Sequence, residues 1–245
     1  GSSNLLFADR ARITKWGQSG ATAYQGWTPQ TNSPSLAASL NDMSGLASIR
    51  WDGGAVLLSG DWSALNSNCT YFTGAPLSGS SCSGTWTLSP SVTFVSASAS
   101  SGTAALSVTA ASSLTYLNTA GSSFVVTGSV SALTACATIQ CATGVAFNCS
   151  GDLSALSALK SLYAPTGSST LTYPTASGTH SWPAGMNQIH LRSQTLPTAS
   201  IVALLADLAA QSVWTGNKVV NLKAINSSEA ASAQTSAAAA ISSLQ

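Results

Sequence analysis

Apolar positions recur through the middle of the chain with a period of about 22–23 residues, which is in the range of stacked repeat architectures. When these anchor positions are aligned in one column, the interval from one to the next varies by a single position. Each anchor opens a run of four residues rich in β-branched, aromatic and leucine side chains, which is typical of a short strand. A fixed period of this size indicates one structural unit stacked on copies of itself. The anchors are Leu46, Cys69, Val92, Leu114, Ala137 and Leu159.

Other columns keep the same phase. A glycine lies roughly two thirds of the way from one anchor to the next in four of the repeats, at Gly60, Gly84, Gly128 and Gly151. Further apolar residues lie between these glycines and the next anchor. In several repeats a second apolar run lies between the first strand and the glycine, at 56–58, 124–126 and 145–147. We therefore expect extended structure on two sides of each coil. The pattern predicts a mainly β fold with a C-terminal α segment, a β-solenoid with coils of about 22–23 residues and capping segments.

The period fails at both ends, and this divides the chain into three parts. Residues 1–45 are predicted to be an N-terminal cap or docking segment, in which a short helix starts at Pro34 or Ser35. Residues 46–188 form the repeat solenoid. Residues 189–245 are predicted to be a C-terminal strand–helix repeat and a helical cap. Helical spacing of apolar residues begins after Pro197, a strand is expected over 219–225, and a second, alanine-rich helix after Asn226.

One column is aromatic in three consecutive repeats. Tyr71, Phe94 and Tyr116 occupy the same position, so in a solenoid their rings stack about 4.8 Å apart. If this column faces outward, it is a platform for sugar rings or a partner protein; if it faces inward, it is core. The residues that follow each ring are apolar too, which favours a sheet covered by a ligand or by protein. Trp16 and Trp27 are further binding candidates, because aromatic residues are enriched at interfaces.

The five cysteines contain two pairs with the same spacing. Cys69 is separated from Cys82 by the same length of chain as Cys136 is from Cys149, and a loop of that length closes within one coil. We predict these two disulfides, each stabilising by roughly 3 kcal/mol. Buried free thiols are the alternative, and Cys141 competes for Cys149. The spacing does not suit zinc, so no metal is expected.

Charge is scarce. Lysine and arginine number 8, aspartate and glutamate 7, which is 6% of the chain against about a quarter in average proteins. A net charge of +1 provides no field for nucleic acid, and no apolar run approaches the roughly 18 residues that membrane insertion needs. Weak charge repulsion favours self-association. We expect an extracellular protein, either secreted to the cell surface or part of a virion surface. The alternative is a neutral globular domain of unusual composition.

The residues that catalysis requires are few. The two histidines are His180 and His190, and the acidic residues are scattered. Asp61 and Asp152 share a column, but four repeats separate them by roughly 20 Å, too far for glycosidase chemistry. His190 and Arg192 form the best polar pair, with a solvated face or an inter-subunit contact as the simpler interpretation. We therefore expect no enzyme activity and no cofactor.

The segment 151–162 resembles an irregular leucine-rich repeat, because leucine recurs every three residues and the run ends in a strand. Segments 128–133 and 60–65 are degenerate copies, and 189–208 followed by 220–222 is similar to longer repeats with a convex helix. The resemblance covers roughly residues 46–225. The usual asparagine ladder is missing, since Asn118 and Asn221 are isolated, so an orthodox horseshoe and a flatter β-solenoid both stay open. Similar repeats occur in bacterial surface and phage virion proteins, and the family implies binding or scaffolding without catalytic residues.

Two functions follow from these observations. The first is a non-enzymatic, self-assembling subunit of a surface filament, layer or virion, whose partners are copies of itself. The alternative is a monomeric adhesin that binds surface glycans or a protein along the aromatic column.

Overall fold

The computed structural model describes residues 15–17, 36–39, 48–50, 56–61, 70–73, 77–96, 99–102, 105–119, 125–141, 146–164, 170–191, 196–211 and 219–221. Side-chain surroundings are described for residues 70–72, 84–96, 105–119, 125–141, 146–164, 170–191, 196–211 and 219–220. All structural statements below refer to these residues.

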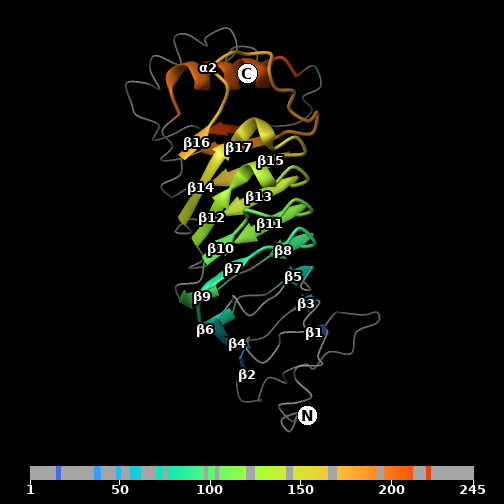
Figure 1. Cartoon of the computed structure of the whole chain (residues 1–245), viewed down its shortest axis with the longest axis vertical. Helices are drawn as coiled ribbons and strands as arrows, with labels where there is room; N and C mark the ends of the chain where they lie inside the picture. Colours follow the sequence, from blue (N-terminus) through green and yellow to red (C-terminus); the bar gives the residue numbers. More distant parts are fainter. Residues whose placement is uncertain are drawn as a thin grey trace.

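The chain is a parallel β-solenoid whose strands stack along the long axis of the molecule (Figure 1). One wall, sheet A, has nine parallel strands in the order β1-β3-β5-β8-β11-β13-β15-β17-β18. Their bounds are Lys15–Gly17, Ser48–Arg50, Tyr71–Thr73, Phe94–Ser96, Tyr116–Thr119, Thr138–Cys141, Ser161–Ala164, Gln188–Leu191 and Val219–Asn221.

Two smaller parallel sheets form the other walls of the solenoid. Sheet B contains β2 (Leu36–Ser39), β4 (Val56–Asp61), β6 (Leu77–Ser83) and β9 (Ala99–Gly102). Sheet C contains β7 (Thr85–Thr87), β10 (Ala105–Ser107), β12 (Val125–Ser129), β14 (Ala146–Asp152) and β16 (Thr170–Thr172). The coils that begin with β5 and β8 pass through all three sheets, whereas those that begin with β11 and β13 have two strands and a 3₁₀ turn, η3 (Val130–Ala132) or η4 (Leu153–Ala155).

The strand register confirms the predicted period. From β5 to β15 each strand of sheet A pairs with its equivalent in the next coil, as Tyr71 does with Phe94 and Phe94 with Tyr116. The coil then lengthens, because Ser161 pairs with Gln188 and Gln188 with Val219.

Strands begin one or two positions after the predicted anchors, because the anchor closes the preceding turn. The N–H groups of Val92, Leu114 and Leu159, for example, donate to the carbonyls of Ser89, Ala111 and Leu156. Side-chain hydroxyls add to the register: Thr115 Oγ1 donates to the carbonyl of Thr93 at 2.8 Å.

The glycine column marks a bend at the end of the second strand: Gly84 directly follows β6, and Gly128 and Gly151 are the penultimate residues of β12 and β14. Gly84, Gly128 and Gly151 have φ of 80°, 105° and 108°, a region that favours glycine. The residue after each of the last two bends caps a 3₁₀ turn. Ser129 Oγ accepts from the N–H of Ser131, and Asp152 Oδ1 accepts from the N–H of Ser154.

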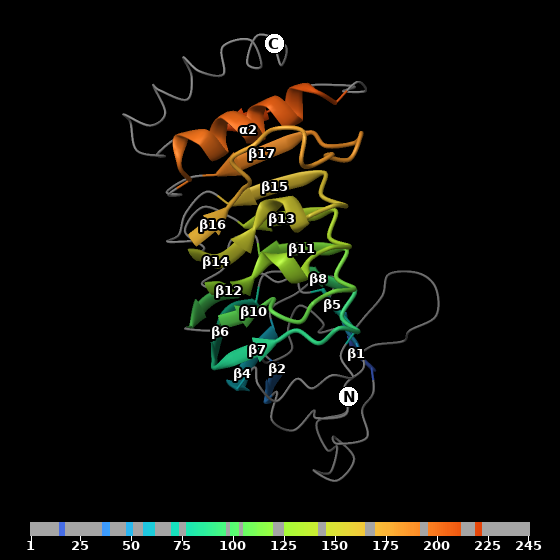
Figure 2. The same ribbon diagram turned by 45° about the horizontal axis from the view of Figure 1, so that its top comes forward.

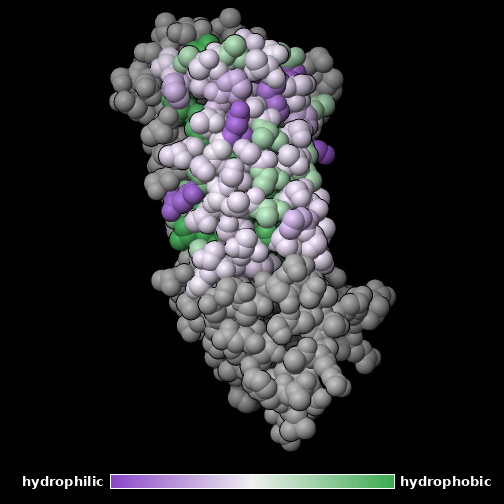
Figure 3. All heavy atoms as spheres, in the orientation of Figure 1, coloured by the Kyte–Doolittle hydropathy of each residue, from purple (hydrophilic) through white to green (hydrophobic). Residues whose placement is uncertain are grey.

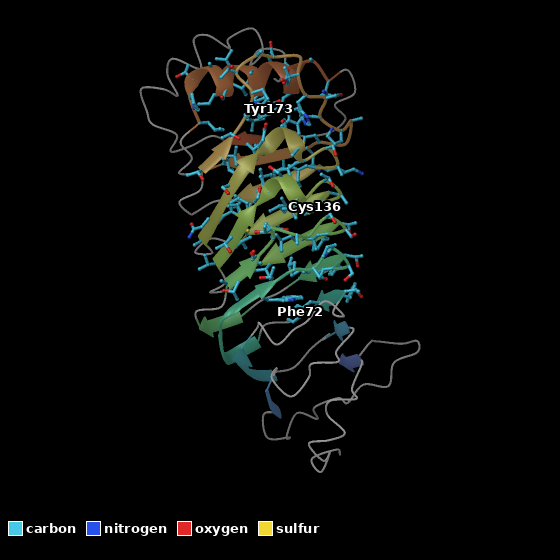
Figure 4. All side chains as sticks on the ribbon, in the orientation of Figure 1. Phe72, Cys136 and Tyr173 are labelled. Carbon is cyan, nitrogen blue, oxygen red and sulfur yellow. The ribbon has the colours of Figure 1, made fainter. Side chains whose placement is uncertain are left out.

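Among the described side chains, the core lies between sheets A and C and is filled by their inward columns and by apolar residues of the turns that connect them. Figure 4 labels Phe72, Cys136 and Tyr173, which lie at successive levels of the stack. At the C-terminal end of the described stack, α2 (Thr198–Ala209) lies across β17 and adds its apolar face to the same core (Figure 2). This helix and its start after Pro197 confirm the spacing-based prediction.

The stack also reaches into residues 1–45. β1 pairs with β3, and β2 pairs with β4, both in parallel. The predicted helix near Pro34 was wrong, because Leu36–Ser39 is a strand. A short apolar spacing specifies a helix weakly, and backbone pairing with the next coil overrides it. The predicted helix after Asn226 lies outside the described residues.

Candidate functional site

The outward face of sheet A carries two columns of side chains. In β8 the middle residue is buried, and in β11, β13, β15 and β17 the second and fourth residues are buried, so the residues that alternate with them face outward, as the two-residue period of a strand requires. The first column is Tyr71, Phe94, Tyr116, Thr138, Ser161, Gln188 and Val219. The second column is Ser96, Asn118, Gln140, Tyr163 and His190.

The predicted aromatic column is a continuous stack in the first column. Ring centroids are 4.7 Å apart from Tyr71 to Phe94 and from Phe94 to Tyr116, with interplanar angles of 11° and 8°. Carbon atoms in contact prefer a separation of about 3.5–4.0 Å, so rings this far apart touch when each is offset by roughly 3 Å. Each ring then overlaps its neighbour only in part, and a strip of each face remains uncovered by the next ring.

The sequence left open which way this stack faces, and the structure places it outside. Phe72, which follows Tyr71, is 0% exposed, whereas Tyr71, Phe94 and Tyr116 are half-buried. At β13 the next residue of the column is Thr138, so the stack of rings ends at Tyr116. There the phenolic oxygen of Tyr116 accepts a hydrogen bond from Asn118 Nδ2 at 3.2 Å, which links the two columns.

Beyond the stack the face becomes polar and then aromatic again. Gln140 is exposed, and Ser161 Oγ donates to Gln188 Oε1 at 3.2 Å. In the second column, the rings of Tyr163 and His190 lie 4.7 Å apart at 48°. Sequence reasoning identified His190 but missed Tyr163. The period of two, counted from buried Leu162, is the signal that finds it.

The described side chains of these columns, from β5 to β18, include no lysine, arginine, aspartate or glutamate. They combine hydroxyl, amide, imidazole and aromatic groups. Exposed Lys160 directly precedes β15, and the backbone register places Lys15 and Arg50 in the first and second columns at β1 and β3. Figure 3 shows one face of the molecule, on which most described residues are of intermediate hydropathy.

Two predicted binding residues are not part of this described face. The register places Trp16 beside Ile49, which pairs in turn with Phe72 of the core column. The side chain of Trp16, all of Trp27 and Arg192 lie outside the described residues.

The cysteine prediction needs correction. Cys136, Cys141 and Cys149 are buried free thiols, so the predicted Cys136–Cys149 disulfide is wrong and the alternative describes these residues. Cys136 closes the turn before β13 and its thiol donates to the carbonyl of Thr138 at 3.3 Å, whereas Cys149 faces inward from sheet C. The side chains of Cys69 and Cys82 lie outside the described residues.

Burial makes these thiols poor nucleophiles. It raises the pKa of Cys136 to about 12 and that of Cys141 to about 11, in the latter case against a hydrogen bond from Thr119. Burial also raises the pKa of Cys149, and a charge on Cys141 would raise it further. A thiol that stays protonated in an apolar core packs as a small hydrophobic group.

A second polar cluster fixes the segment after β16 to α2. Tyr173 Oη donates to Asp207 Oδ2 at 2.7 Å, and the N–H of Gly178 donates to Asp207 Oδ1. Ser200 Oγ donates to the carbonyl of Tyr173 at 2.6 Å. Asp207 and Ser200 are 1% and 2% exposed. A buried carboxylate held by several donors serves to position chain segments, and we assign this cluster a structural role.

Aromatic packing completes that cluster. Trp182 stacks on Tyr173 with ring centroids 6.0 Å apart at 4°, and His180 meets Trp182 edge-on at 4.4 Å. Burial lowers the pKa of His180, although the carboxylates of Asp207 and Asp152 act in the opposite direction. The neutral imidazole therefore belongs to the packing of this segment.

Comparisons with protein-family models, with curated proteins and with solved structures find no match. Within the described part of the chain, no three His, Cys, Asp or Glu side chains come together to hold a metal ion. Among the described residues no helix is long and apolar enough to cross a membrane.

Proposed function

We propose that this protein is a non-enzymatic, extracellular binding module that holds a neutral glycan on the outward face of sheet A. The observation that carries the proposal is the outward stack of Tyr71, Phe94 and Tyr116 beside hydroxyl and amide side chains. Sugar rings present C–H groups on their faces and hydroxyls around their edges. Aromatic faces and edges fit the former, and amides and hydroxyls fit the latter.

The charge of the face supports a neutral ligand. An acidic polysaccharide is normally held by lysine or arginine, and the described columns from β5 to β18 contain neither. Composition also supports a rigid platform: tyrosine provides contact area at low cost in conformational entropy, and serine and asparagine provide adaptable hydrogen bonds. A parallel solenoid holds these side chains at fixed spacing, so little ordering is needed on binding.

We also propose kinship with leucine-rich repeats. Support comes from the 3₁₀ turns that follow the second strand, η3 and η4, and from the buried leucines within or directly after them, Leu133, Leu153 and Leu156. These turns occupy the place that a convex segment has in such repeats, and α2 occupies it in the longer coil before β18.

Self-assembly into a filament, layer or virion is the second candidate. The observation that favours it is the low charge of the whole chain, in which 6% of residues are charged. Self-assembly is not the first choice, because Val219, with 43% of its surface accessible, is the large hydrophobic residue exposed among the described side chains. A scattered apolar residue of this kind is normal on a monomer.

Binding of the full-length chain to a panel of neutral and acidic glycans tests the proposal. We expect binding to a neutral glycan and about tenfold weaker binding on Tyr116→Ala, which corresponds to about 1.4 kcal/mol for one lost ring contact. Thr87→Ala, which alters an exposed residue of sheet C, is the matched control and should bind as the natural chain does. A folded protein that binds no neutral glycan, or that prefers acidic ones, refutes the proposal; association that rises with protein concentration then favours self-assembly.

A further inference from the structure

We propose that the ligand is a linear neutral glycan that lies along the solenoid axis, with aromatic contacts at both ends of a polar step; this rests on the proposed function. The track consists of Tyr116, Asn118, Thr138, Gln140, Tyr163 and His190.

The aromatic groups change column along the axis. The stack that ends at Tyr116 lies in the first column, and the Tyr163–His190 pair lies in the second. β11 and β15 are two strand spacings apart, about 9.6 Å. Between them, β13 presents Thr138 and Gln140, and no ring. A ligand that uses both aromatic contacts must therefore cross the polar step.

The step has the groups that a sugar hydroxyl requires. Gln140 is exposed and carries both an amide donor and an amide acceptor. The oxygen of Tyr116 accepts from Asn118, so the phenolic hydrogen of Tyr116 is directed elsewhere and serves as a donor. A chain with alternating apolar faces and hydroxyl edges matches this order of ring, amide and ring.

The short strands determine the direction of the ligand. β11 has four residues and β13 also has four, of which two in each face outward. A chain lying along one strand therefore meets two side chains. A chain lying along the axis meets a new pair at about every 4.8 Å.

A peptide is the less suitable occupant. Extended peptides bind sheets by adding to an edge strand, where backbone donors and acceptors are unpaired. In the track the backbones of β11, β13 and β15 are paired on both sides within sheet A. Only side chains are offered, which suits a glycan with hydroxyls along its length.

Calorimetric titration of the full-length chain with oligomers of the neutral glycan that binds best tests the track. Affinity should rise with oligomer length at least until the oligomer spans β11 to β17. Tyr163→Ala should weaken the longest oligomer about tenfold and leave the shortest binding oligomer unchanged. Gln140→Ala should weaken the long oligomers as well.

Two variants guard this test against simple misfolding. Tyr163→Phe keeps the ring and should retain most of the affinity, and Thr172→Ala on sheet C should change nothing. If the shortest oligomer binds as tightly as the longest, or if Tyr163→Ala binds long oligomers normally, the track is wrong while glycan binding stands. If no neutral glycan binds, or a neutral extended peptide binds in its place, the track and the proposed function both fail.

Discussion

The bend glycines provide the sharpest test of how the coils are held in register. At Gly128 φ is +105°, and a Cβ built there lies 2.5 Å from Thr109 Oγ1 and 3.0 Å from the Thr109 backbone nitrogen. Thr109 belongs to the preceding coil, so its backbone cannot withdraw without moving that coil. Gly128→Ala therefore adds a steric clash to an unfavourable backbone conformation.

Two other glycines separate these contributions. Gly178 has φ of +79°, but a Cβ there meets nothing within 4 Å, so Gly178→Ala reports the backbone strain alone. Gly185 has no positive φ, and its Cβ meets the flexible side chain of Lys160 at 3.2 Å. Gly185→Ala should lie within about 0.5 kcal/mol of the natural chain.

The expected losses follow from this comparison. For Gly178→Ala, strain of about 1–2 kcal/mol is partly offset by about 0.4–1 kcal/mol from the less flexible unfolded chain, leaving roughly 1 kcal/mol. For Gly128→Ala, backbone strain of about 1–3 kcal/mol and overpacking of about 1–3 kcal/mol combine to roughly 3–4 kcal/mol. At about 2–4 °C per kcal/mol, this lowers the melting midpoint by roughly 10 °C.

Thermal and urea unfolding of the three variants, followed by far-ultraviolet circular dichroism, measures these differences. The predicted order of stability is Gly185→Ala, then Gly178→Ala, then Gly128→Ala. If Gly128→Ala melts with Gly178→Ala, the clash with Thr109 is absent in solution. If it melts with Gly185→Ala, the positive φ is absent as well, and the account of the bend is refuted.

Three further predictions concern stability. Phe94→Ala removes two ring contacts, each worth about 0.5–1.5 kcal/mol, and should lower the free energy of unfolding by roughly 1–3 kcal/mol. Thr87→Ala should leave it unchanged, and equal unfolding midpoints for the two variants would contradict a stabilising stack. Because burial raises the pKa of Cys136 from 9.0 to about 12, the unfolded chain loses this proton first, so stability is retained below pH 9 and lost as the pH rises. By about pH 11 this difference in pKa lowers the free energy of unfolding by roughly 2–3 kcal/mol. The urea midpoints of Cys136→Ala should therefore fall less steeply with pH than those of the natural chain, and parallel curves would exclude the thiol as a cause. Tyr173→Phe removes a hydrogen-bond donor from the buried Asp207 carboxylate and should lower the free energy of unfolding in urea by about 1–3 kcal/mol. An unchanged urea midpoint would rule this effect out.

The repeat could be predicted from sequence because every coil must solve the same packing problem. An inward residue such as Leu117 meets its equivalents in the coils above and below, so the column stays apolar from coil to coil. The glycine column is equally constrained, since Gly128 and Gly151 combine a positive φ with no room for a Cβ. These demands recur every coil and leave a period in the sequence.

Other features depend on contacts that no local pattern contains. Leu36, Leu40 and Met43 have helical spacing, yet 36–39 pairs as a strand with 56–59, and only that long-range partner distinguishes the two outcomes. The spacing of Cys136 and Cys149 permits a disulfide, but the turn directs the Cys136 thiol to the carbonyl of Thr138. Sequence separation gives loop length and says nothing of side-chain direction.

The outward columns differ from the inward ones in a way that bears on function. The inward column remains large and apolar from Phe72 through Ile189, because packing between coils demands it. The outward column changes from rings to a hydroxyl between Tyr116 and Thr138, although the backbone register continues without a break. Stability alone favours continuing the stack of rings, since each added ring contributes a further contact. The backbone does not require this change from rings to a hydroxyl, and amides and then a second aromatic pair follow it along the face. This is the pattern expected of a surface that binds a ligand, and the length-dependent titration tests whether the face binds one.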